Sequence, residues 1–244
     1  MCEIRLADCD IVVLSLEGET ARRQAITALS GHLRLSFRIV DAIRCSPGPI
    51  GCGLSHMKAL RAWDGARPLL VLEDDVEAGE DFQASFLAPD DADAIYLGVS
   101  RFGAVEAVDF VGFVDVLAAE PAAPGLLRIH NMLGAHAILH LTTRWRDAAV
   151  EAMTAAMVDH GWDPDRGLAR IQGHFNVYAT ERPAFYQTAA LQPEGRGWLQ
   201  EAATRALPPP PREGDRIALM IEGQPREVVL TRDGPRLLWL WAAP

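Results

Sequence analysis

Three consecutive carboxylates follow an apolar run in the segment LLVLEDDV, residues 69–76. The run is typical of a buried strand, and Glu73, Asp74 and Asp75 at its end repel one another. A hard divalent cation would offset that repulsion, because carboxylate oxygens are ligands that such cations prefer. A solvated acidic turn is the other interpretation, and the three residues alone leave both open.

A glycine-rich segment, SPGPIGCGLSHMKALRAW, lies about twenty residues upstream, at 46–63. Its prolines and glycines predict a loop over 44–53 and then a helix over 54–66, with Ser55 and His56 in or near the first turn. Free N–H groups at a helix N-terminus suit a phosphate. Ser55 could equally serve only as the helix cap.

The elements that must position these side chains alternate between strand and helix, which predicts an α/β fold with a parallel or mostly parallel sheet and helices on both faces. Ligands of such sheets bind beyond the carboxyl ends of the strands, where the three acids are expected. The expected strands are 10–16, 35–43, 67–75, 93–99, 133–141 and 175–187, with one or two more in 107–131, and the expected helices are 18–33, 54–66, 81–87, 142–160 and a short one within 161–174.

Four prolines mark a linker at 207–211. We therefore expect a catalytic domain over 1–206 and a small β appendage over 212–244, whose three short strands include a turn at Asp233-Gly234.

The composition suits a globular protein of 244 residues, 49% of them hydrophobic, and its formal charge of −10 argues against a nucleic-acid partner. The four cysteines, at positions 2, 9, 45 and 52, form no C-x-x-C pair, so free thiols in a reducing cytosol are expected rather than a structural zinc site. The N-terminus lacks a signal peptide and no apolar run reaches the ~18 residues that span a bilayer, so we expect a cytoplasmic protein.

Four segments in order, IVVLSLEGETARR, DAI, SPGPIGCGLSHMKALRAW and LLVLEDDV, resemble the successive motifs of glycosyltransferase family 25. That family includes bacterial lipopolysaccharide-core galactosyl- and glucosyltransferases and animal collagen galactosyltransferases. The resemblance runs from about residue 10 to about residue 190, and MLGAHAILHL (132–141) and ERPAFYQ (181–187) are similar to later family segments.

The resemblance implies a GT-A fold, with a Rossmann-like sheet, and an inverting transfer of a hexose from a UDP-sugar with Mn²⁺ or Mg²⁺ as cofactor. Its E-D-D segment then corresponds to the D-x-D element of GT-A enzymes. Glu73 and Asp75, which project to the same side of an extended chain, are the expected metal ligands, and Asp74 is expected to contact ribose or donor sugar.

Further site residues are expected around the donor. His174, and alternatively His136, is a candidate third metal ligand. The candidates for nucleotide contacts are Ser15, Leu16, Arg22 or its neighbour Arg23, Asp41, Ser55 and His56.

An inverting displacement needs a base for the acceptor hydroxyl. The resemblance assigns this role to Asp163 or Asp165, in the segment GWDPDRG. Asp163 could instead cap the helix that Pro164 begins.

The chain departs from the family at Pro49, where an acid is usual, at the missing tyrosine of the 132–141 segment, and at Arg182, where a proline is usual. These departures put the acceptor in doubt more than the donor. A cell-surface glycan such as lipopolysaccharide core is the expected acceptor. A protein that binds or hydrolyses a nucleotide-sugar on the same fold is the alternative, and peripheral membrane association and homo-oligomers stay open.

Overall fold

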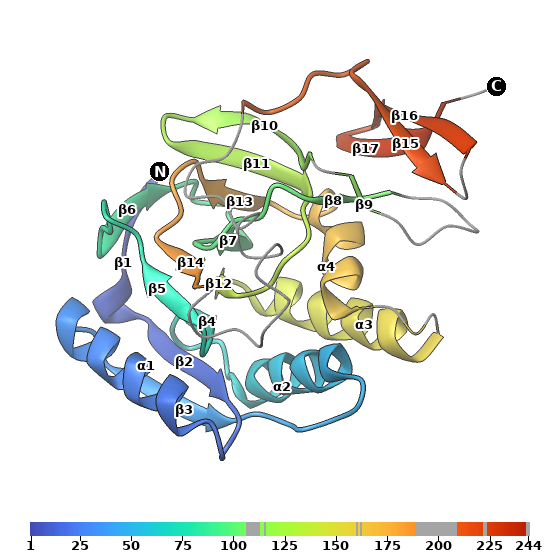
Figure 1. Cartoon of the computed structure of the whole chain (residues 1–244). Coiled ribbons are helices and arrows are strands. Elements are labelled where there is room, and N and C mark those ends of the chain that lie inside the picture. Colours follow the sequence, from blue (N-terminus) through green and yellow to red (C-terminus); the bar gives the residue numbers. More distant parts are fainter. Residues whose placement is uncertain are drawn as a thin grey trace.

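An eight-stranded sheet forms the centre of the computed structural model, which describes residues 1–105, 113–114, 116–159, 161, 163–188, 209–221 and 224–242 (Figure 1). The strand order is β10-β11-β13-β7-β12-β4-β2-β3. In chain order these strands are β2 (Asp10–Ser15), β3 (Phe37–Asp41), β4 (Leu69–Glu73), β7 (Ala94–Tyr96), β10 (Ala118–Ala123), β11 (Leu126–Asn131), β12 (Ala137–His140) and β13 (Val177–Thr180).

The sheet is mixed. Strand β2 is parallel to both β3 and β4, and β13 is parallel to β7, whereas β12 runs antiparallel between β4 and β7. Strands β10 and β11 extend one edge in antiparallel pairing. This arrangement confirms the α/β class, although four of the seven strand pairs in this sheet are antiparallel, where a parallel or mostly parallel sheet was expected.

Helices cover both faces of the sheet, as expected. They are α1 (Thr20–Leu33), α2 (Gly48–Ala62), α3 (Thr143–Asp159) and α4 (Pro164–Gln172). Alternate residues of β2 enter opposite cores: Val12 packs with Met57 of α2 and Trp145 of α3, and Val13 packs with Ile26 of α1. Strand β4 is apolar at four consecutive positions because its side chains also alternate between these two cores.

Two short strand pairs extend the molecule beside the main sheet. Strand β5 (Val76–Ala78) pairs with β14 (Phe185–Gln187), and β1 (Cys2–Arg5) pairs with β6 (Ser85–Ala88). The helix predicted over 81–87 is therefore wrong, because residues 81–84 are a turn and irregular chain and residues 85–88 are a strand. Residues 85–88 form a strand because β1, far away in sequence, supplies the antiparallel partner, with Ile4 opposite Phe86.

Helix α2 begins six residues earlier than the sequence predicted, at Gly48 instead of position 54. The glycines of this segment lie inside the helix. A Cβ at Gly53 would lie 2.6 Å from Met157 Sδ of α3 and 2.7 Å from Pro164 Cβ of α4. The glycine-rich composition at this position thus serves close helix packing, and the predicted loop over 44–53 ends at Pro47.

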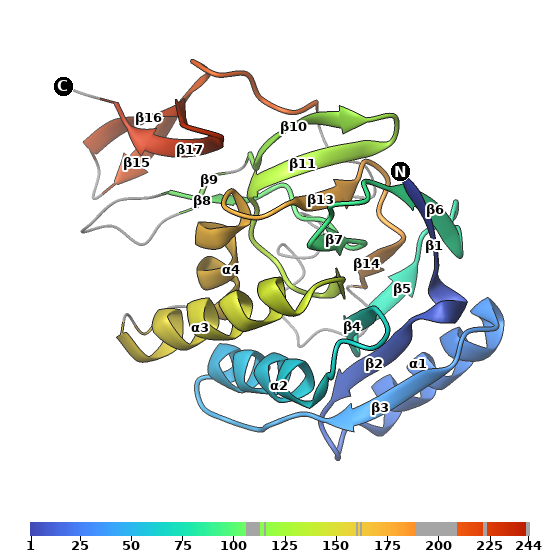
Figure 2. The ribbon, with the colours of Figure 1, turned by 180° about the vertical axis from the view of Figure 1, so that it is seen from behind.

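The C-terminal residues form a three-stranded antiparallel sheet of β15 (Arg216–Ile221), β16 (Gln224–Asp233) and β17 (Arg236–Trp241), with Gly234 at φ 59° in the predicted turn. It packs on residues near β8 (Gly103–Ala104) and β9 (Phe113–Val114), and the buried Trp239 donates from Nε1 to Val116 O at 2.9 Å. Both views place this sheet at the opposite end of the molecule from α1 and β3 (Figure 2). The predicted linker at 207–211 lies partly outside the described residues.

No helix in the described part of the chain combines the length and the apolar character that a bilayer crossing requires.

Candidate active site at the carboxyl end of β4

The three acids stand where β4 ends and its neighbours supply polar groups. Glu73 closes the strand, and Asp74 and Asp75 form the turn into β5. Asp74 and Asp75 are 6% and 5% exposed, so they are not the solvated turn that the sequence left open.

Asp74 is fully engaged by the protein. Its Oδ2 accepts a hydrogen bond from Ser15 Oγ at 2.7 Å, and its Oδ1 forms an ion pair with Arg22 Nη1 at 2.7 Å. Ser15 is the last residue of the parallel neighbour β2, and Arg22 lies in the first turn of α1. This acid therefore connects β4 to β2 and α1.

Glu73 and Asp75 turn to a common donor instead. The side-chain amide of Gln187 lies 3.1 Å from Glu73 Oε2 and 3.4 Å from both Asp75 oxygens. Burial, and then the charge of Glu73, raise the pKa of Asp75 to about 7, although Arg22 at 3.9 Å opposes the shift. Gln187 was not among the predicted site residues, although it ends the segment ERPAFYQ (181–187).

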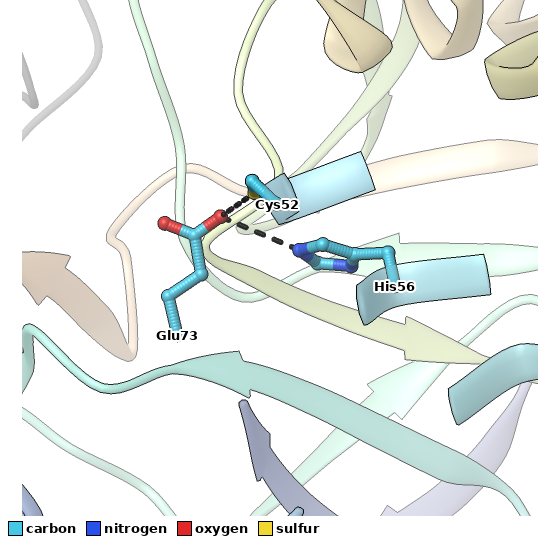
Figure 3. A group of neighbouring side chains, drawn as sticks. All are labelled: Cys52, His56 and Glu73. Carbon is cyan, nitrogen blue, oxygen red and sulfur yellow. Dashed lines mark hydrogen bonds and ion pairs between the residues drawn. The ribbon is translucent and has the colours of Figure 1, made fainter. Parts of the chain in front are cut away.

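The other oxygen of Glu73 faces α2. Cys52 Sγ donates to Glu73 Oε1 at 3.2 Å, and His56 Nε2 lies 3.3 Å from the same oxygen (Figure 3). Burial raises the pKa of Glu73, but the contacts with His56, His136 and Cys52 together lower it, and the pKa lies below the usual value. Burial and the Glu73 charge raise the pKa of the Cys52 thiol well above normal.

Cys52 was expected to be a free thiol, and its contact with Glu73 was not predicted. Its spacing of four residues from His56 on a helix was the available signal, because such residues share one helix face.

Arg23 holds the ends of β2 and β3 together. Its guanidinium donates to Ser15 O at 2.9 Å, Leu16 O at 3.1 Å and Asp41 Oδ1 at 2.6 Å. Arg22 and Arg23 are thus both inside the network, although the sequence analysis expected only one of them there. Leu16 and Asp41 stay predicted nucleotide contacts, and their oxygens named here accept from Arg23.

Two other predicted residues have different surroundings. Ser55 lies in the middle of α2, where its hydroxyl donates to Gly51 O at 2.6 Å and accepts from Ile43 N at 2.8 Å, so it is not a helix cap. His174 follows α4, and its Nε2 lies 3.1 Å from Arg236 Nη1 of β17. The contacts of these two residues do not include the three acids.

Asp165, one of the two predicted candidates for the base, lies in the first turn of α4. Its Oδ2 accepts from Gly134 N at 3.0 Å, and Gly134 adopts φ 114°, a conformation that favours glycine. Removal from water raises the pKa of Asp165 to about 6, and the charges of Asp163 and Glu73 contribute to the shift. Asp163 is exposed at the helix start, and no hydrogen bond from its side chain caps the helix.

The donor set fits a divalent cation. Glu73 and Asp75 offer carboxylate oxygens on the same side, and a cation between them would offset the repulsion that raises the pKa of Asp75.

No family model and no curated protein matches the chain, so the resemblance to glycosyltransferase family 25 stays a prediction. Among solved structures, the chain is similar to a Drosophila β-1,4-galactosyltransferase 7 mutant in complex with manganese, UDP-Gal and xylobiose. The two are 9% identical, with a TM-score of 0.38 over 97% of this chain and 95% of that one.

Proposed function

We propose that the chain is a glycosyltransferase that moves a hexose from a UDP-hexose to a hydroxyl acceptor. The observation that supports it most is the convergence of Glu73, Asp75 and Asp165 beside the carboxyl end of a central strand. Ligand sites of α/β sheets lie at such ends.

Glu73 and Asp75 would hold Mn²⁺ or Mg²⁺ on the side that they share. When bound, the cation supplies positive charge for the diphosphate that departs with uridine. Asp74 would act indirectly, because its bonds to Ser15 and Arg22 fix the turn that carries Asp75.

Asp165 is the proposed base for an inverting transfer. Its carboxylate would take the proton of the acceptor hydroxyl while the acceptor oxygen bonds to sugar C1 and the bond from C1 to the diphosphate breaks. A pKa of about 6 leaves the group mostly unprotonated at neutral pH but still basic enough to receive a proton. The helix-start position and exposure of Asp163 favour Asp165 of the two predicted candidates.

The acceptor is proposed from the resemblance alone, as a cell-surface glycan such as lipopolysaccharide core.

The test is UDP release from a panel of UDP-sugars with Mn²⁺, with and without glycan acceptors. Release that requires an acceptor supports transfer. Equal release without acceptor would instead indicate a hydrolase, and binding without release would indicate a nucleotide-sugar binding protein. In the same assay, Asp165→Asn tests the proposed base, and Asp163→Asn is its matched control. If no UDP-sugar binds or reacts, the proposal is wrong.

A further inference from the structure

Cys52, His56 and Glu73 bring three different ligand types together. Cys52 and His56 lie one turn apart on α2, and Glu73 ends the neighbouring strand β4. Their ligand atoms all lie within 4.8 Å of one another, and Figure 3 shows the thiol and the imidazole directed at the same carboxylate oxygen. Among the described residues, this is the one such group of three.

Two of the three spacings match the edges of a tetrahedral metal site, and the third, from Cys52 Sγ to His56 Nε2, is no more than 4.8 Å. Zinc bonds of roughly 2.0–2.3 Å at tetrahedral angles put ligand atoms roughly 3.3–3.6 Å apart. Here Sγ and Oε1 are 3.2 Å apart, and Nε2 and Oε1 are 3.3 Å apart. Small shifts of these three side chains would therefore place their ligand atoms around one ion.

We propose that Cys52, His56 and Glu73 form a binding site for Zn²⁺ or a similar borderline-soft transition metal. Thiolate and imidazole favour such ions over Mg²⁺ and Mn²⁺, which prefer oxygen ligands. Three protein ligands leave the fourth position of a tetrahedral ion open to water or a substrate oxygen.

The surroundings of the group favour a cation. Asp75 shares the Gln187 amide with Glu73, and the charges of Asp165 and Asp75 both act on the Cys52 thiol, so further negative groups surround the three ligands. His136, on the chain entering β12, accepts a backbone hydrogen bond from Glu73 N at 2.9 Å. Its buried ring nitrogen Nε2 has no hydrogen-bond partner in the part of the chain that the structure describes, so a second imidazole nitrogen near Glu73 is uncommitted.

A purely structural role is the competing explanation. In that case the thiol and imidazole only hold the Glu73 carboxylate in place, and the group has no special affinity for zinc. The inference does not depend on the proposed sugar transfer, although the two sites would share Glu73, with Oε1 facing α2 and Oε2 facing Gln187 and Asp75.

The experiment uses the full chain without nucleotide, so its outcome is separate from that of the UDP-release assay. Metal-free protein is loaded with Zn²⁺ in the presence of excess Mn²⁺, desalted and assayed for bound metal. In parallel, Co²⁺ is added and the absorption spectrum recorded. We expect about one zinc per chain, and a thiolate-to-cobalt charge-transfer band in the near ultraviolet with the visible bands of tetrahedral cobalt.

Cys52→Ser and His56→Gln should lose the tightly held zinc, whereas Cys45→Ser should keep it, because Cys45 is exposed before α2. Absence of both retained zinc and the charge-transfer band in the wild type overturns the proposal without need of any variant. Equal zinc in the wild type and in a folded Cys52→Ser variant also overturns it, because the metal would then lie elsewhere.

Discussion

Glu73 and Asp75 share a single donor, the side-chain amide of Gln187, at 3.1 Å and 3.4 Å. Asp74, between them, turns the other way to Ser15 and Arg22. The E-D-D segment therefore contains one acid neutralised by the fold and two acids that face a common side. This division explains why a buried strand can end in three like charges.

The first prediction compares two neighbouring acids in metal-free protein. Asp74→Asn should lower the free energy of unfolding by about 1.5–3 kcal/mol, because it weakens charge-assisted bonds with Arg22 and Ser15. Asp75→Asn should leave stability equal or slightly higher, since it removes repulsion from Glu73. Urea denaturation of both variants measures this, and a larger loss for Asp75→Asn than for Asp74→Asn would refute the division of roles.

The second prediction concerns the base. Turnover should fall as the pH drops below about 6, because a protonated Asp165 cannot accept the acceptor proton. Asp165→Asn should lower turnover roughly 10²–10⁴-fold and keep UDP-sugar binding. Asp163→Asn should stay within a few-fold of wild type. A normal rate for Asp165→Asn would place the base elsewhere.

The third prediction concerns His140, whose Nδ1 accepts from Trp145 Nε1 at 3.0 Å in the core. Burial lowers the pKa of this imidazole from 6.5 to about 3, so the folded chain keeps the ring neutral. Below pH 6.5 the unfolded chain binds a proton here that the folded chain does not, and stability falls as the pH drops towards 3. The contribution between pH 7 and pH 5 is about 2 kcal/mol.

His140→Gln should flatten the pH dependence of unfolding, measured by urea denaturation at several pH values, whereas His32→Gln on exposed helix surface should not. An unchanged slope for His140→Gln would contradict the neutral buried ring.

The fourth prediction concerns the C-terminal sheet. Trp239 is fully buried in a cluster with Val105 and Ala118 of the preceding chain, so Trp239→Ala should cost about 3–5 kcal/mol of stability in that sheet. Trp241→Ala, at a half-buried position, should cost less. Removing residues 209–244 should expose the apolar residues that the sheet covers, which include Val105, Val114 and Ala118. Aggregation or a change in oligomeric state, seen by light scattering, should follow. A truncated chain with unchanged mass distribution and activity would mean that the appendage is dispensable.

The spacing of apolar residues predicted the elements whose pattern lies within a single segment of the chain. The β2, α1 and α3 segments, and the three tail strands, lie close to their expected positions. Residues 85–88 were misassigned because their partner strand lies about 80 residues away. The start of α2 was misplaced because the glycines at 51 and 53 suggest a loop, whereas close packing against Ile43, α3 and α4 requires them in the helix.

Local sequence patterns likewise predicted only part of the candidate site. The E-D-D segment was visible in the sequence because its charges interrupt an apolar run. The contacts of Cys52 and Gln187 with Glu73 depend on how α2 and β14 approach β4, and no local pattern contains that information.

Calorimetric titration of UDP into the wild type and Asp75→Asn, each with and without Mn²⁺, shows whether Glu73 and Asp75 hold a cation that binds the donor. The wild type should bind UDP much more tightly with Mn²⁺, and at a hundredfold excess over the dissociation constant this binding stabilises the fold by about 2.7 kcal/mol. Asp75→Asn should fold normally and show little gain from Mn²⁺. Equal UDP affinity in all four titrations would contradict the proposed metal site, because Glu73 and Asp75 would then have no part in holding a cation for the donor.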